Sequence, residues 1–186
     1  EGANSPADVL LTVDAGRLFR AKEAGILAPL ESDILTQRIP AAYRDPDNQW
    51  FGLSLRSRVI MFDKSRVSAA EISRYEDLAD PKWKGEICIR SSGNIYNQSL
   101  LASLIEHLGE EATEAWAEGL VANMARRPQG GDRDQIRAAV AGQCKLAVSN
   151  TYYLAGMLNS GVAADIEVAE QIGVIWPNQA DRGAHM

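Results

Sequence analysis

The sequence predicts an α/β fold, and three observations support this prediction. Short apolar runs typical of buried strands recur along the chain. Segments whose apolar residues have helical spacing stand between these runs, and glycine or proline marks many of the boundaries. Because strands that alternate with helices are typical of parallel sheets, we expect largely parallel sheets flanked by helices.

The predicted elements begin with a buried strand at residues 8–13 and a helix at residues 16–24, which Gly25 ends. Three prolines indicate a loop-rich stretch at residues 28–49. Asp132 stands at the start of a later helical segment, where an aspartate is a favourable cap. The other expected strands cover residues 50–62, 86–90, 145–149 and 173–176, and the other expected helices cover residues 72–78, 97–108, 110–124, 132–141, 151–159 and 165–171.

Composition excludes several classes of partner. The 186 residues suffice for one sizeable domain or two small ones, and 46% apolar and 24% charged residues are typical of a globular protein. The net charge of -6 argues against nucleic acid, which needs clustered lysine and arginine. No apolar stretch approaches the roughly 20 residues of a membrane span. We therefore expect no nucleic-acid partner and no direct membrane insertion.

Three of the five tyrosines stand just past the ends of predicted strands. Tyr96 follows residues 86–90, and Tyr152 and Tyr153 end the apolar run at residues 144–151. Proteins of the α/β class place ligands at strand ends. Phenolate oxygen is a hard anionic donor, and a trivalent cation such as ferric iron binds the deprotonated form of a phenol whose ordinary pKa is about 10. The pattern indicates a candidate site for such a cation.

The adjacent tyrosines leave two arrangements open. In a regular helix the side chains of Tyr152 and Tyr153 diverge by about 100°. Both reach one ion only at a helix start or an irregular turn, and Asn150 and Thr151 favour such a start. In the alternative arrangement, Tyr152 packs in the core and Tyr153 lies at the surface.

The two cysteines also have two interpretations. Cys88 and Cys144 lie in the strand-like runs that lead to the tyrosine segments. A disulfide between them would tie the two strands together in an oxidising compartment. Two buried free thiols are the alternative, because cysteine is among the most buried residue types. Neither cysteines nor histidines have the spacing of a zinc site.

Several segments resemble the ferric-ion-binding proteins that serve bacterial ABC iron importers. These binding proteins belong to the extracellular solute-binding proteins. The similarity extends over nearly the whole chain, in the expected order, and its most specific parts contain the tyrosines. The segments are residues 7–16 (ADVLLTVDAG), 50–53 (WFGL), 75–85 (YEDLADPKWKG), 95–99 (IYNQS), 127–134 (RPQGGDRD), 150–154 (NTYYL) and 176–179 (WPNQ).

The resemblance implies a periplasmic-binding-protein-like fold whose two lobes close on the ion, present here as a piece that is incomplete at both ends. It implies that residues 1–50 form a partial first lobe with the crossover and that residues 51–172 form the second lobe with the tyrosine site. Residues 173–186 would be a truncated strand that returns toward the first lobe. It also implies a periplasmic location, although the start of the chain has no signal-peptide pattern.

The resemblance further implies the ligands and partners. Ferric iron would bind Tyr96, Tyr152 and Tyr153 and would be delivered to the permease of an ABC transporter. In related proteins an arginine in the strand at residues 50–62 holds a synergistic anion such as carbonate, which suggests Arg56. Further iron ligands would come from segments before the first residue, or from water, an anion or another chain.

Alternatives remain for the arginines and for the function. Arg56 and Arg58 share one face of the predicted strand, where they are alternatively two solvated charges. Another ligand of the same fold, such as a polyamine, thiamine or an oxyanion, is the second functional hypothesis. An enzyme with a tyrosinate–metal site is the third, but no catalytic motif is visible and only two histidines are present, so we expect no enzyme.

Overall fold

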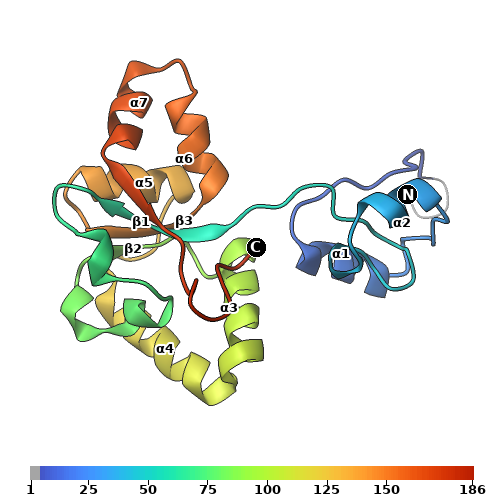
Figure 1. Cartoon of the computed structure of the whole chain (residues 1–186), viewed down its shortest axis with the longest axis horizontal. Coiled ribbons are helices and arrows are strands. Elements are labelled where there is room, and N and C mark those ends of the chain that lie inside the picture. The colour runs from blue at the N-terminus through green and yellow to red at the C-terminus, as the bar shows by residue number, and fades with distance from the viewer. Residues whose placement is uncertain (1–4) are drawn as a thin grey trace. The chain divides into compact units, whose positions relative to one another are not determined.

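The chain divides into two compact units. The computed structural model describes residues 5–186, and the boundary between the units lies between Leu55 and Arg56, five residues beyond the expected one (Figure 1). Each unit is described by itself below. Within residues 5–186, no helix combines the length and the apolar character that crossing a membrane requires.

The first unit consists of short helices joined by irregular segments. Helix α1 spans Ala15–Glu23, as expected, and the side chain of Asp14 accepts a hydrogen bond from the Gly16 amide at its start. Helix α2 spans Asp33–Arg38 inside the stretch predicted as loops, and a 3₁₀ turn follows at Ala41–Tyr43.

The prediction of a buried strand at residues 8–13 is wrong. These residues are irregular, and the side chains of Val9 and Leu11 are 83% and 82% exposed. A strand needs a neighbour for its backbone hydrogen bonds. Among residues 5–55 the only strand-like pairing is an isolated bridge between Arg44 and Phe51.

The second unit is built on a four-stranded sheet. Its strands are β1 (Arg58–Asp63), β2 (Ile87–Cys88), β3 (Leu146–Asn150) and β4 (Ile172–Ile175), in the order β2-β3-β1-β4. The α/β class is confirmed, but the largely parallel sheet is wrong. Only β2 and β3 are parallel, because β1 lies between β3 and β4 and is antiparallel to both. The alternation of strands and helices along the chain predicts how the strands are connected. It does not predict whether paired strands are parallel, because that depends on which strands become neighbours in the sheet.

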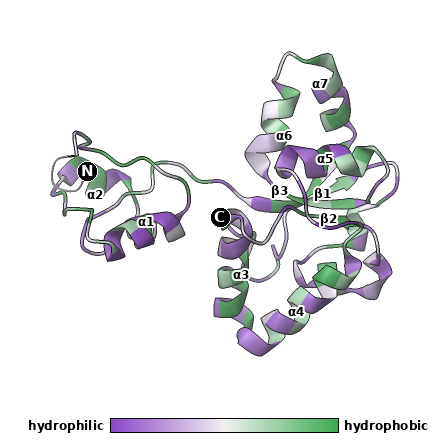
Figure 2. Cartoon of the chain, turned by 180° about the vertical axis from the view of Figure 1, so that it is seen from behind, coloured by the Kyte–Doolittle hydropathy of each residue, from purple (hydrophilic) through white to green (hydrophobic). Residues whose placement is uncertain are grey.

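Helices pack on both faces of this sheet (Figure 1). Helices α3 and α4 lie on one side, and α5, α6 and α7 lie on the other (Figure 1). Figure 2 shows polar and apolar residues alternating along α3 and α4, as in helices that bury one side. Their bounds are Ile95–Leu108, Glu110–Asn123, Asp132–Val140, Thr151–Leu158 and Ala163–Glu170.

Alternate residues of β1 belong to two different apolar clusters. Ile60 and Phe62 pack with α3 and α4, whereas Val59 and Met61 pack with α5 and α6. This is the two-residue period of a strand that is covered on both faces. The sheet is therefore held rigidly between two layers of helices.

Residues 173–186, predicted as a strand returning to the first lobe, begin within β4, which pairs with β1 inside the second unit. Further along, the Asn178 side chain accepts a hydrogen bond from the Tyr75 amide at 3.0 Å. The Arg58 amide donates to the His185 carbonyl at 2.9 Å. This segment thus follows the edge of the second unit up to the start of β1.

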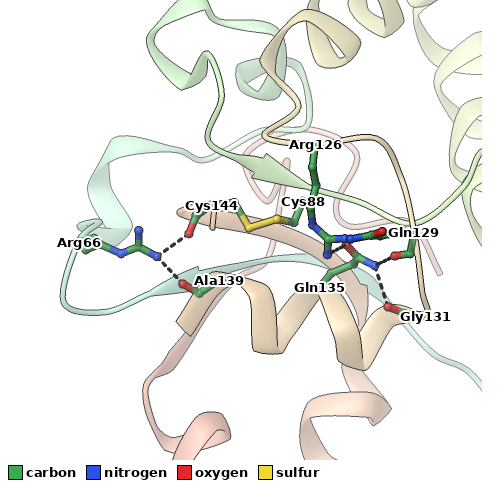
Figure 3. The surroundings of a disulfide bond; sticks show 8 residues. All are labelled: Arg66, Cys88, Arg126, Gln129, Gly131, Gln135, Ala139 and Cys144. Carbon is green, nitrogen blue, oxygen red and sulfur yellow. Dashed lines mark hydrogen bonds between the residues drawn. A yellow bond between two sulfur atoms is a disulfide. The ribbon is translucent and has the colours of Figure 1, made fainter. Parts of the chain in front are cut away.

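A disulfide joins the two cysteines. Cys88 ends β2, and Cys144 precedes β3, with 56 residues of sequence separation and a Cα–Cα distance of 5.9 Å. Figure 3 shows this bond beside Arg66, whose guanidinium donates to the carbonyls of Ala139 and Cys144. The bond ties together the two strands that lead to Tyr96 and to Tyr152.

We expect the disulfide to stabilise the second unit substantially. Closing a loop of about this length restricts the unfolded chain and contributes roughly 4 kcal/mol. The variant C88A/C144A should therefore lose about that much free energy of unfolding in a urea titration. Reduced wild-type protein should unfold near the same urea concentration as the variant. If reductant leaves the wild-type midpoint unchanged, the disulfide contributes nothing.

Candidate metal centre

Two helices begin at the same edge of the sheet and bring tyrosines together. Helix α3 follows β2, with the Asn94 side chain accepting from the Tyr96 amide at 3.0 Å. Helix α6 follows β3 directly and starts at Thr151. Because β2 and β3 are parallel neighbours, their carboxyl ends lie together. The Tyr152 hydroxyl consequently donates a hydrogen bond to the Tyr96 hydroxyl at 3.1 Å.

Tyr153 completes a cluster of three phenols. The ring centroids of Tyr152 and Tyr153 are 4.3 Å apart, with the ring planes tilted by 35°. Tyr153 packs against the apolar cluster of α5 and α6, while Tyr152 is 39% exposed. The alternative with Tyr152 in the core and Tyr153 at the surface is therefore wrong, since the first turn of α6 directs them the opposite way.

The environment of Tyr152 favours its neutral form. Burial raises the pKa of Tyr152, and hydrogen bonds with the Tyr153 and Tyr96 phenols raise it further. A hydrogen bond from Asn150 opposes this rise in the pKa of Tyr152. Hydrogen bonds among the three phenols stabilise their neutral forms, so a single phenolate is disfavoured. A bound cation takes the place of the shared protons and reverses this preference.

Two guanidinium groups lie over the Tyr96 ring. The Arg56 Cζ is 5.6 Å and the Arg90 Cζ is 5.7 Å from the ring centroid. Arg90 also pairs with Asp132 at 3.3 Å. Arg56 makes no ion pair with any of residues 5–186, and this half-buried cation beside the phenols is suited to an oxyanion.

Arg58, by contrast, is not exposed to solvent, and it does not lie over the Tyr96 ring as Arg56 does. It is 2% exposed, and its Nη1 lies 3.0 Å from Asp132 Oδ2 and 3.0 Å from Asn150 Oδ1. Its Nε and Nη2 donate to Asn97 Oδ1 at 3.0 and 2.6 Å. Burial lowers the pKa of Arg58, while the Asp132 carboxylate opposes that shift. The positions of the arginines along the predicted strand do not show that one of them has a buried carboxylate partner.

Asp132 is not the helix cap that the sequence indicates. It is the first residue of α5, is fully buried, and accepts from Arg58 and from the Asn150 amide at 2.9 Å. The carboxylate that caps this turn belongs to Asp134, which accepts from the Gly131 amide at 2.7 Å. Both aspartates follow the same pair of glycines, so local sequence does not distinguish their roles.

Sequence analysis also missed Asn97 and Asn150 as partners of the buried arginine. The available signal was their position, directly after Tyr96 and two residues before Tyr152. Among residues 5–186, no group of three or more histidine, cysteine, aspartate or glutamate side chains could hold a metal ion. The oxygen donors gathered at this edge are phenols.

Comparison with known proteins identifies the family. The family model for bacterial extracellular solute-binding proteins matches residues 4–181. The chain belongs to this family. The match covers both units and includes every residue of the tyrosine cluster.

The related sequences are proteins of iron uptake. The chain is 55% identical over its full length to iron uptake protein A1 of Synechocystis and covers 52% of that protein. It is 34% identical to the Fe(3+)-binding periplasmic protein of Serratia marcescens, over 82% of this chain and 44% of that one. The chain thus spans about half the length of the curated relatives that it matches, and these relatives are iron-binding transport proteins, not enzymes.

Solved structures of the family have the same fold. The Trichodesmium protein IdiA, or FutA, in complex with iron and citrate aligns with a TM-score of 0.95 at 55% identity. The ferric binding protein from Campylobacter jejuni also aligns with a TM-score of 0.95, at 44% identity. These alignments cover 98% and 99% of this chain and 58% of each structure.

We expect Asp132 to be the most sensitive acidic residue of the second unit. Asp132→Ala leaves Arg58 buried without its partner, which should lower the free energy of unfolding by about 3 to 5 kcal/mol. Glu86→Gln breaks the partly exposed pair with Lys145 and should cost less than about 1 kcal/mol. Urea titrations of both variants provide the measurement. Equal losses would contradict the assignment of Asp132 as a buried structural anion.

Proposed function

We propose that this chain supplies the tyrosine ligands with which a periplasmic solute-binding protein captures ferric iron. The single observation that carries the proposal is the 3.1 Å separation of the Tyr96 and Tyr152 hydroxyl oxygens, which come from two different helices. Tyr153 stacks beside Tyr152 on the same first turn. Oxygens that already share a proton are close enough to share a metal ion instead.

The chemistry of the cluster fits a trivalent cation. Phenolates are hard anionic ligands, and their negative charge offsets the charge of ferric iron. Because the pKa of Tyr152 is raised in this unit, iron binding has to release protons, so apparent affinity falls as pH is lowered. The similarity to proteins named for iron uptake and ferric binding supports the same choice of ion.

Three phenols leave other coordination positions of the ion for further ligands. The relatives are about twice as long as this chain, so parts of the longer proteins are candidates. A synergistic anion such as carbonate is another, and the half-buried Arg56 beside Tyr96 is placed to hold it. Citrate accompanies iron in the Trichodesmium structure, which supports an oxyanion in this role.

We further propose that the captured ion is handed to the permease of an ABC transporter. Membership in the extracellular solute-binding family supports this route, and the Serratia marcescens relative is named as a periplasmic protein. The chain's role is thus binding and delivery without chemical conversion of the ligand.

Addition of ferric salt should produce a purple-to-red tyrosinate charge-transfer band. Tyr153→Phe removes one phenolate and should abolish or strongly weaken this band, whereas Tyr43→Phe, in the first unit, should leave it unchanged. Absorption spectra and elemental analysis of the same samples provide the measurement. Protein purified without chelator that contains no iron and stays colourless with ferric salt would refute the proposal in favour of an organic cation or oxyanion ligand.

A further inference from the structure

One buried side chain connects the two tyrosine-bearing segments. Arg58, at the start of the central strand β1, donates to Asn97 on α3 and to Asn150 at the end of β3. These asparagines stand one residue after Tyr96 and two residues before Tyr152. The guanidinium thus forms a direct link between the backbones that carry the two hydrogen-bonded phenols.

On the α3 side, Asn97 is held at both ends of its amide. Its Oδ1 accepts two hydrogen bonds from Arg58, at 3.0 and 2.6 Å. Its Nδ2 donates to the carbonyls of Arg90 and Ser91, at 2.8 and 3.2 Å. The turn between β2 and α3 is thereby fastened to β1, and Tyr96 on the first turn of α3 is fastened with it.

On the α6 side, Asn150 is held equally firmly. Its Oδ1 accepts from Arg58 Nη1 at 3.0 Å, and its backbone amide donates to Asp132 Oδ2 at 2.9 Å. Asn150, two residues before Tyr152, is thereby fastened both to β1 and to α5.

Burial makes this network stiff. Arg58 is 2% exposed and Asp132 is fully buried, so water does not compete for their hydrogen bonds. A guanidinium is a planar fork that reaches several acceptors at once, which the single ammonium of lysine does not reproduce. Arg58 uses Nε, Nη1 and Nη2 in this way, toward α3, α5 and β3.

We infer that Arg58 is a positioning residue of the iron site, which sets the separation of the Tyr96 and Tyr152 oxygens through Asn97 and Asn150. The inference rests on the proposed function and adds to it a determinant of affinity that does not touch the ion. Outer groups that orient metal ligands typically contribute 10- to 100-fold to metal affinity. The Arg58 network should fall in this range.

The test uses three variants that weaken the network. Arg58→Lys loses the fork, while Asn97→Ala and Asn150→Ala each remove one acceptor and leave the buried pair with Asp132 in place. Each should release ferric iron to citrate at least about tenfold faster than wild type and shift the charge-transfer band. The asparagine variants decide the question even if Arg58→Lys does not fold.

Arg66→Met is the matched control. Arg66 also belongs to the second unit and donates to two backbone carbonyls, beside the disulfide, but it contacts neither asparagine (Figure 3). It should lower thermal stability while leaving the band and the release rate within about twofold of wild type. Unchanged bands and rates in both alanine variants, or an equal effect of Arg66→Met, would overturn the inference. A wild-type chain that gives no band refutes the proposed function itself.

Discussion

The buried ion pair between Arg58 and Asp132 is the interaction on which the site depends. Removing two charges from water is costly, and the cost is offset only when every donor and acceptor finds a partner. Here the surplus donors and acceptors of the pair are satisfied by Asn97, Asn150 and backbone groups of β3. Because the buried guanidinium needs all of these partners, α3, α5 and β3 each supply a group that contacts Arg58.

The second constraint is the parallel pairing of β2 with β3. It is the only parallel pair in a sheet whose other two pairings are antiparallel, and it brings the starts of α3 and α6 to one edge. The disulfide between Cys88 and Cys144 joins the end of β2 to the segment that leads into β3. A covalent tie and a buried ionic network therefore act on the same pair of segments.

Much of this architecture was predictable from local patterns. The α-helices α3 to α7 begin and end within two residues of the expected positions, because helical spacing and capping residues are local signals. The helix expected at residues 72–78 is wrong, since residues 72–75 are irregular and only a 3₁₀ helix follows at Glu76–Ala79. The tyrosines were found because they follow apolar runs. The strand at residues 8–13 was predicted wrongly, since an apolar run becomes a strand only where a partner strand pairs with it.

The α/β class, the α-helices of the second unit and the phenols that follow predicted strands could be recognised without coordinates. The mixed sheet, the burial of Arg58, and the role of Asp132 as its partner instead of a helix cap could not. They depend on contacts between residues that are far apart along the chain. Arg58 and Asp132 are 74 residues apart, so their contact exists only once the sheet and its helices have assembled.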